Sequence, residues 1–262
     1  MVTGIYTIKS HKISTMPRNI RLIARLDVKG PNVIKGVHLE CLRIVGQPDE
    51  LAKRYYEEGA DELLYLDTVA SLYGRENLVD IVARASRHLF IPLTAGGGIR
   101  SLANIRSLLR AGADKVAINT WAIKNPEFIT AAARSFGSQC IVGSIEAKKI
   151  EPHRWEAYAE NGREPTGRNV LEWAQELETR GAGELLVTSI DQEGTRKGFD
   201  IELMNTVADK VSIPVIASGG AGTKEHVREI AHSAPIDAVA VASLLHYHEE
   251  TIANLKKQLP HE

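Results

Sequence analysis

The chain of 262 residues has 32 lysine and arginine and 33 aspartate and glutamate residues, so it offers no basic surface of the kind that binds nucleic acid. No apolar run could span a bilayer, the first residues lack the apolar core of a signal peptide, and Cys41 and Cys140 provide neither a disulfide framework nor metal-ligand spacing. We therefore expect a cytoplasmic protein without a metal or other cofactor. Residues 1–15 are expected to form a poorly organised extension and residues 16–262 a single domain.

Short apolar runs alternate with helical patterns along this domain. The expected strands cover residues 21–29, 62–67, 91–95, 114–119, 140–146, 184–189, 213–217 and 237–241. The expected helices cover residues 48–56, 76–87, 102–110, 126–135, 169–180, 201–210 and 248–258, with another opening at 219–222. Residues 33–36 begin a loop that could close over a site. Nearly continuous apolar strands indicate a parallel sheet covered on both faces, and at this length they predict a (β/α)8 TIM barrel ahead of an open doubly wound α/β sheet.

The two halves of the chain repeat each other. Residues 59–67 resemble 181–189, residues 91–98 resemble 213–221, and residues 112–120 resemble 236–243. Asp27 and Glu146 have a similar separation, and each ends an apolar strand pattern. Two similar half-barrels would place these carboxylates opposite each other at the barrel mouth, where they would suit general acid–base catalysis. The alternative is that they are two unrelated strand-end acids.

Glycine clusters follow the third and seventh expected strands. Without side chains, residues 96–98 and 219–222 would let backbone N–H groups approach an anion. Asn119-Thr120 and Ala242-Ser243 follow the fourth and eighth strands and would complete one such site in each half. We therefore expect a ligand with two phosphates, with purely steric glycine turns as the alternative.

From about Arg21 to the C-terminus, the sequence resembles the cyclase subunit (HisF) of imidazole glycerol phosphate synthase. The matching motifs include Leu26-Asp27-Val28-Lys29, Lys35-Gly36, Gly112–Val116, Phe136–Gln139 and Ala217–Gly222. In that family, a glutaminase docks on the bottom of the barrel, and ammonia passes through the barrel to a bisphosphate substrate at the top. The resemblance implies that Asp27 and Glu146 are catalytic. It also implies phosphate or substrate contacts from Lys35, Gly98, Asn119, Thr120, Gly194, Gly220, Ala242 and Ser243.

The same resemblance implies an ammonia gate at the bottom of the barrel. Its four members would be Arg21, Glu62, Lys115 and Glu184, two positive and two negative side chains that can pair. The alternative is that these four charged side chains only solvate the lower end of the barrel. Asp114 matches the family's partner-facing acid, so we predict a HisH-like glutaminase partner.

Three residues depart from the family pattern. Glu146 and Glu193 stand where the family usually has aspartate, and one added methylene moves a carboxylate by roughly 1 Å, which can cost on the order of a hundredfold in rate. Arg25 replaces a small residue and should point into the barrel with Asp27, because side chains alternate along a strand. We expect Arg25 to pair with Asp27 or Glu146 and to lower the pKa of both carboxyl groups.

These departures resemble the HisF-like proteins of acetamidino sugar modification, which accompany a glutaminase and an N-sugar amidotransferase. Residues 23–27, 34–40, 70–74 and 144–147 support this resemblance. We therefore expect a subunit of a glutamine amidotransferase complex that conducts ammonia for modification of a surface-glycan sugar of the lipopolysaccharide O-antigen type. The alternative is the cyclase (a lyase) of histidine biosynthesis. An isomerase built from the same half-barrels is less favoured, because it has no use for the gate.

Overall fold

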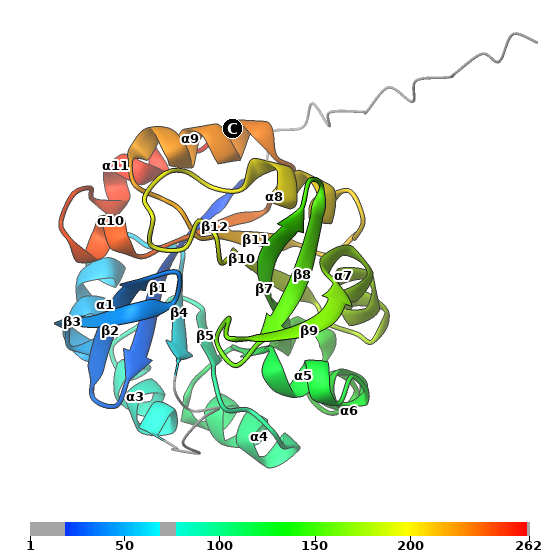
Figure 1. Ribbon diagram of the computed structural model, residues 1–262. Helices are drawn as coiled ribbons and strands as arrows, with labels where there is room; N and C mark the ends of the chain where they lie inside the picture. Colours follow the sequence, from blue (N-terminus) through cyan, green and yellow to red (C-terminus); the bar gives the residue numbers. More distant parts are fainter. Residues whose placement is uncertain (1–18, 69–76, 261–262) are drawn as a thin grey trace, which may run out of the picture.

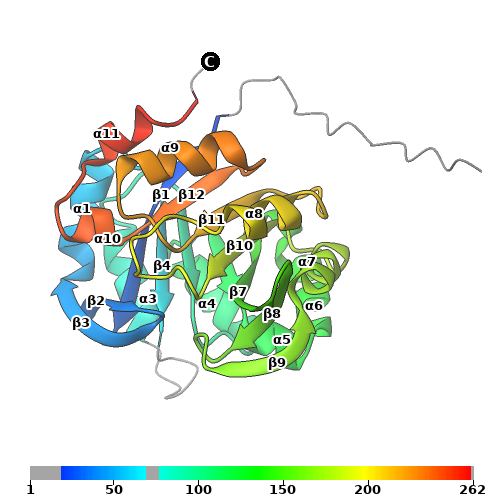
Figure 2. The ribbon, with the colours of Figure 1, turned by 45° about the horizontal axis from the view of Figure 1, so that its top comes forward.

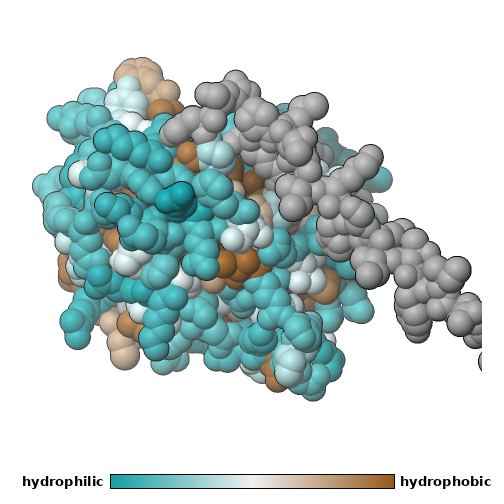
Figure 3. Space-filling model, turned by 90° about the horizontal axis from the view of Figure 1, so that it is seen from above, coloured by the Kyte–Doolittle hydropathy of each residue, from teal (hydrophilic) through white to brown (hydrophobic). Residues whose placement is uncertain are grey.

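The computed structural model describes residues 19–68 and 77–260 (Figure 1). The expected extension at residues 1–15 and the motif at residues 70–74 lie outside the described residues. In the described ranges, no helix has the length and apolar character needed to cross a membrane. The face of the molecule seen in Figure 3 is mostly hydrophilic, with scattered hydrophobic residues.

Eight parallel strands close into a barrel. They are β1 (Arg21–Lys29), β4 (Glu62–Asp67), β5 (Leu93–Gly96), β6 (Lys115–Ile118), β7 (Ile141–Glu151), β10 (Glu184–Ser189), β11 (Val215–Ser218) and β12 (Ala238–Val241). Each strand pairs with the next, β7 pairs with β10, and β12 pairs with β1 to close the ring. The predicted (β/α)8 barrel is therefore confirmed.

Helices surround the strands on the outside (Figures 1 and 2). They are α1 (Pro48–Glu57), α3 (Asn77–Ala85), α4 (Leu102–Ala111), α6 (Glu127–Phe136), α7 (Val170–Thr179), α8 (Ile201–Ala208) and α9 (Lys224–Ser233), with the short α5 (Thr120–Lys124), η1 (Ser138–Cys140), α10 (Ser243–His246) and α11 (Ile252–Lys256). Ser101 begins α4 by accepting the N–H of Asn104, and Gly112 ends it with a φ of 113°. The expected helix at 248–258 is shorter in the structure, and the short α5 and α10 were not predicted.

Two antiparallel hairpins rise from the barrel. β1 continues into β2 (Asn32–Val37) and β3 (Glu40–Gly46), and β7 continues into β8 (Arg154–Ala159) and β9 (Glu164–Asn169). They lie on opposite sides of the barrel mouth (Figure 1). The segment expected to be a loop at residues 33–36 is therefore part of a strand, and β7 extends beyond its predicted end at Glu146. Since β1 and β7 are the first strands of the two halves, the hairpins follow the internal repeat.

The barrel interior is apolar in the middle. Its side chains form a separate buried cluster of Ile23, Leu64, Ala117, Val142, Leu186, Ile216, Ala238 and Ala240. Since side chains alternate along each strand, the neighbouring residues face the helices and form the main core with them. Charged and polar side chains lie at either end of this apolar section.

Candidate active site

Asp27 and Glu146 stand at equivalent points of the two halves. Asp27 lies where β1 begins to pair with β2, opposite Ile34, and Glu146 lies where β7 begins to pair with β8, opposite Tyr158. Each carboxylate therefore stands where its strand leaves the barrel for a hairpin. This is the C-terminal end of the parallel strands, where barrel enzymes carry their reactive groups.

The Arg25 guanidinium is buried beside Asp27. Its Nε donates to Asp27 Oδ1 at 2.8 Å, and its Nη1 donates to Thr188 Oγ1 at 3.1 Å and to Ser218 Oγ at 2.9 Å. Of the two partners expected for Arg25, the structure thus shows Asp27. Burial would raise the pKa of Asp27, but the positive charges of Arg25 and Lys35 outweigh burial and hold the pKa below its ordinary value.

Lys35 and Glu193 complete this group of buried charges. Lys35 Nζ, from β2, forms an ion pair with Glu193 and lies 3.6 Å from Asp27 Oδ2. Glu193 Oε2 lies 4.0 Å from Arg25 Nη1. Burial lowers the pKa of Lys35 to about 8, against the effect of Asp27, which raises it. The two positive and two negative side chains compensate one another in a space with little access to water.

Glu146 has a different environment. Its Oε2 accepts the N–H of Gly162 at 2.6 Å, and burial raises its pKa to about 7 even though this hydrogen bond and the charge of Arg25 act to lower it. Arg25 thus acts on Glu146 in the expected direction, but burial outweighs it, so the expectation that both carboxyl groups have lowered pKa values is wrong for Glu146. Two carboxyl groups with pKa values shifted in opposite directions suit an acid and a base working at neutral pH.

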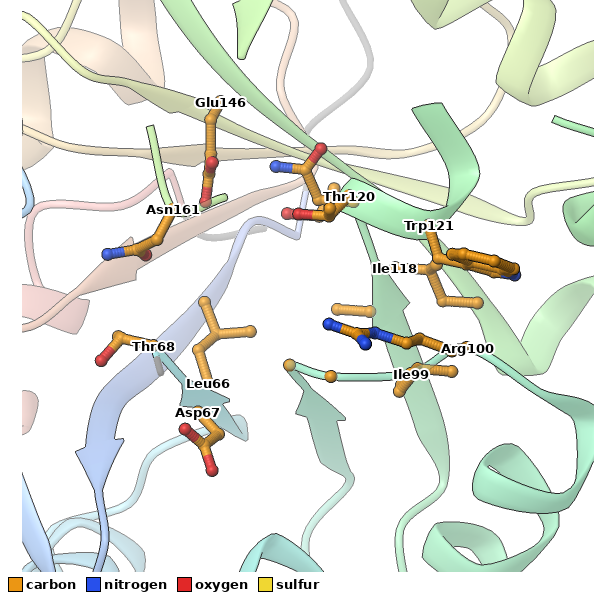
Figure 4. A pocket seen from close by; sticks show the side chains of 15 residues that line it. Leu66, Asp67, Thr68, Ile99, Arg100, Ile118, Thr120, Trp121, Glu146 and Asn161 are labelled. Carbon is orange, nitrogen blue, oxygen red and sulfur yellow. The ribbon is translucent and has the colours of Figure 1, made fainter. Parts of the chain in front are cut away.

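A pocket of about 70 Å³ lies beside Glu146 (Figure 4). The predicted phosphate residues of the first half all line it, namely Gly98, Asn119 and Thr120. The adjacent Gly97 has a φ of 108°, and a Cβ atom there would lie 2.3 Å from the carbonyl oxygen of Asp67, so only glycine fits. The loop after β5 can consequently approach a ligand with its backbone.

The other half contains a narrower pocket of about 10 Å³. The predicted residues Gly194, Gly220, Ala242 and Ser243 line it together with Arg25, Lys35 and Glu193. A Cβ atom at Gly220, whose φ is 105°, would lie 2.0 Å from the carbonyl oxygen of Gly198. The structure thus brings together the predicted phosphate residues of each half.

Four charged side chains form a closed ring at the opposite end of the barrel. Arg21 Nη1 lies 2.7 Å from Glu62 Oε2, and Arg21 also pairs with Glu184. Lys115 Nζ lies 2.7 Å from Glu62 Oε1 and 2.7 Å from Glu184 Oε2. The buried Thr94, which the sequence did not single out, donates to Glu62 Oε1 at 2.6 Å. The four predicted gate residues therefore lie together.

Asp114 is exposed beside this ring, at the start of β6. Its Oδ2 accepts the N–H of Leu93 at 2.8 Å, which ties β6 to β5. Two more aspartates link the starts of neighbouring strands in the same way. Asp61 accepts the N–H of Leu22, and Asp237 accepts the N–H of Val215. Asp114 therefore has a structural contact in addition to the partner contact predicted for it.

The β8–β9 turn supplies site residues that the sequence analysis missed. Glu160, Asn161 and Gly162 have φ values of 49°, 58° and 76°. Asn161 lines the pocket close to Glu146 (Figure 4), and its buried Nδ2 has no hydrogen-bond partner among the described residues. An Asn-Gly pair between alternating apolar residues is a strong hairpin signal and could have located this turn.

His246 of α10 is another residue that the sequence analysis did not single out. Its Nδ1 lies 2.6 Å from the hydroxyl of Tyr55, and burial lowers its pKa to about 3. The imidazole is therefore neutral at physiological pH. Within the part of the chain that the structure describes, His246 included, no group of three or more histidine, cysteine, aspartate or glutamate side chains is arranged to hold a metal ion.

This fold and site define a class: a barrel of two half-barrels with a glycine-lined pocket in each half and a charged ring at the far end. Residues 21–251 match the family described as "Histidine biosynthesis protein", and the chain belongs to that family. It is 64% identical over 207 residues to imidazole glycerol phosphate synthase subunit HisF of Legionella pneumophila, covering 79% of this chain and 98% of that protein. The subunits of the same name from Nostoc sp. and Trichormus variabilis are each 49% identical over 242 residues, covering 91% of this chain and 93% and 94% of theirs. The predicted membership of the HisF family is therefore confirmed.

Proposed function

We propose that this chain is the cyclase subunit of a glutamine-dependent imidazole glycerol phosphate synthase. The relatives are named imidazole glycerol phosphate synthase subunit HisF. The observation that best supports the proposal is the pair of carboxyl groups Asp27 and Glu146, whose pKa values are shifted in opposite directions. Glu146 lines the first-half pocket, and Asp27 is paired with Arg25, which lines the second-half pocket. Of the two functions expected from the sequence, the comparisons favour this one over modification of a glycan sugar.

The two carboxyl groups would divide the proton transfers between them. Asp27 is ionised and can accept a proton, although Arg25 and Lys35 limit its basicity. Glu146, with a pKa of about 7, can donate a proton at neutral pH and take it back. The loops of the two halves would each hold one phosphate of the substrate and so place its reacting atoms between the carboxyl groups.

Ammonia would arrive from the opposite end of the barrel. A HisH-like glutaminase docked there would contact Asp114 and the ring of Arg21, Glu62, Lys115 and Glu184, and the ring would have to open to admit ammonia. Neutral ammonia can then cross the apolar section around Ile23 and Leu186, which charged ammonium could not cross at comparable cost. We expect this complex in the cytoplasm, without a metal or other cofactor.

The decisive assay supplies the bisphosphorylated precursor of imidazole glycerol phosphate and an ammonium salt to the isolated chain, which bypasses the glutaminase. We expect imidazole glycerol phosphate to form, and Asp27→Asn to reduce its formation by at least about a hundredfold. Glu146→Asp, which restores the family's residue, is expected to remain active. A folded protein that makes no product would exclude the cyclase function.

Two observations favour a second function. Arg25 binds the carboxylate that would act as the base, and the second-half pocket is narrow. Both features suit a chain that conducts ammonia to a separate N-sugar amidotransferase for acetamidino modification of a surface glycan. In that case Asp27→Asn would leave amidination by the three-protein mixture unchanged, whereas in the cyclase it removes turnover.

A further inference from the structure

The anion pockets of the two halves differ at one equivalent position of β1 and β7. Arg25 stands two residues before Asp27, and Ser144 stands two residues before Glu146. Ser144 lines the first-half pocket of about 70 Å³, and Arg25 lines the second-half pocket of about 10 Å³. The guanidinium therefore takes up space in one half that a serine leaves open in the other.

The buried guanidinium still has a donor group to offer. The Arg25 side chain is 4% exposed. Its Nε and Nη1 are bound to Asp27, Thr188 and Ser218, whereas Nη2 makes no hydrogen bond to any described residue. A guanidinium presents several N–H groups in a fixed plane that matches the oxygens of a phosphate. The hydroxyl of Ser243 lines the same pocket and could bind another oxygen.

We propose that Arg25 is the main anion ligand of the second-half pocket and binds a phosphate group of the substrate through Nη2 while Nε remains on Asp27. The first-half pocket would instead hold its phosphate through backbone N–H groups and hydroxyl groups. The identity of the substrate rests on the proposed function, but the anion site can be tested without it. Arg25 would then link the bound phosphate to the neighbouring carboxylate and help to position both.

The pocket must widen to accept the anion. A space of 10 Å³ holds no more than about one water molecule. Among its charged lining residues, Lys35 is on the β2–β3 hairpin, which extends beyond the barrel. We therefore expect the Lys35–Glu193 pair to separate when phosphate enters, while Arg25 stays fixed by its contacts to Thr188 and Ser218.

Titration of the full chain with inorganic phosphate tests this assignment. The amide NMR signals of Gly98 and Gly220 report on the two pockets separately. Arg25→Ser places in the second-half pocket the residue type that Ser144 provides at the equivalent position of the first-half pocket. We expect it to weaken phosphate binding at Gly220 by about tenfold or more and to leave binding at Gly98 unchanged. Arg25→Lys, which keeps the charge, should lose only about threefold.

Ser144→Ala is the matched control and should leave the titration at Gly220 unchanged. If Arg25 only fills space, Arg25→Ser enlarges the pocket and phosphate binds at Gly220 as tightly as before or more tightly, which overturns the proposal. An unresponsive Gly220 signal in the unaltered chain also overturns it. If thermal unfolding shows that Arg25→Ser does not fold, Arg25→Met keeps the apolar stem without the charge and allows the same comparison. Because no turnover is measured, this test and the cyclase assay can fail independently.

Discussion

Replacing Glu146 by glutamine should stabilise the protein at alkaline pH although it removes one of the two proposed catalytic carboxyl groups. Burial raises the pKa of Glu146 from its ordinary 4.5 to about 7, so the native protein holds this proton more tightly than the unfolded chain. The stability that the protonated form contributes is complete below the unfolded pKa. It is lost as the pH rises to and through about 7, and a neutral glutamine avoids that loss.

The magnitude follows from the two pKa values. Their separation corresponds to about 3 kcal/mol at 1.36 kcal/mol for each pKa unit. Glu146 is only half-buried, so we expect solvent screening to reduce the effect to about 2 kcal/mol. The hydrogen bond from the Gly162 N–H is retained, since the glutamine side-chain oxygen can accept it as well.

The assay is urea unfolding of the unaltered chain and Glu146→Gln at about pH 5 and about pH 8. Glu156→Gln is the matched control, because Glu156 also accepts a backbone N–H at 2.6 Å, from Gly167 of the neighbouring strand, but lies in an exposed contact. We expect the gain from Glu146→Gln to be about 2 kcal/mol larger at pH 8 than at pH 5, and the control to show no such difference. An equal effect of Glu146→Gln at both pH values would refute the argument that burial raises this pKa.

Three further predictions concern the loops and the ring. Gly97→Ala should lower the free energy of unfolding by about 2 kcal/mol or more, because its Cβ atom would meet the Asp67 carbonyl oxygen. The control is Gly30→Ala, which is also at positive φ but has open space around it and should cost about 1 kcal/mol. Equal costs of the two substitutions in urea unfolding would contradict the packing argument. Thr94→Val should cost about 1–3 kcal/mol in the same assay, because it leaves the buried Glu62 without one donor, and a neutral result would show that water replaces the hydroxyl. Glu62→Gln should reduce glutamine-driven turnover by about tenfold and leave ammonium-driven turnover within about twofold, since it perturbs only the ring; an equal loss in both assays would argue against a gate.

The barrel could be predicted because its strands are buried on both faces and therefore appear as continuous apolar runs. The predicted ranges of β4 and β10 agree with the structure at both ends. The β8–β9 hairpin was missed because it is half-exposed, so its apolar residues alternate with polar ones and form no run. In β8, only Trp155, Ala157 and Ala159 are buried, and this alternation is the signal that a period of two would have detected.

The sequence predicted which residues form the site better than it predicted their protonation and pairing. Strand ends and glycine loops located the carboxyl groups and the pocket of each half, because topology alone brings these positions together. The pKa of Glu146 depends instead on how far the β8–β9 turn covers it, and that turn was not predicted. For Arg25, the sequence indicated a buried cation, but the choice between two carboxylates depended on distances that only the folded chain provides.

The comparison of the two halves suggests why the carboxyl groups differ so much. Asp27 and Glu146 occupy equivalent positions, and burial acts to raise the pKa of both. Asp27 has Arg25 on its own strand and Lys35 on the adjoining hairpin, whereas the equivalent neighbour of Glu146 is the uncharged Ser144. The duplicated fold thus provides two similar sites, and the positive charges in only one of them separate the pKa values. The positions of the cations therefore account for the different pKa values of the two carboxyl groups, and the added length of Glu146 is not needed to explain the separation.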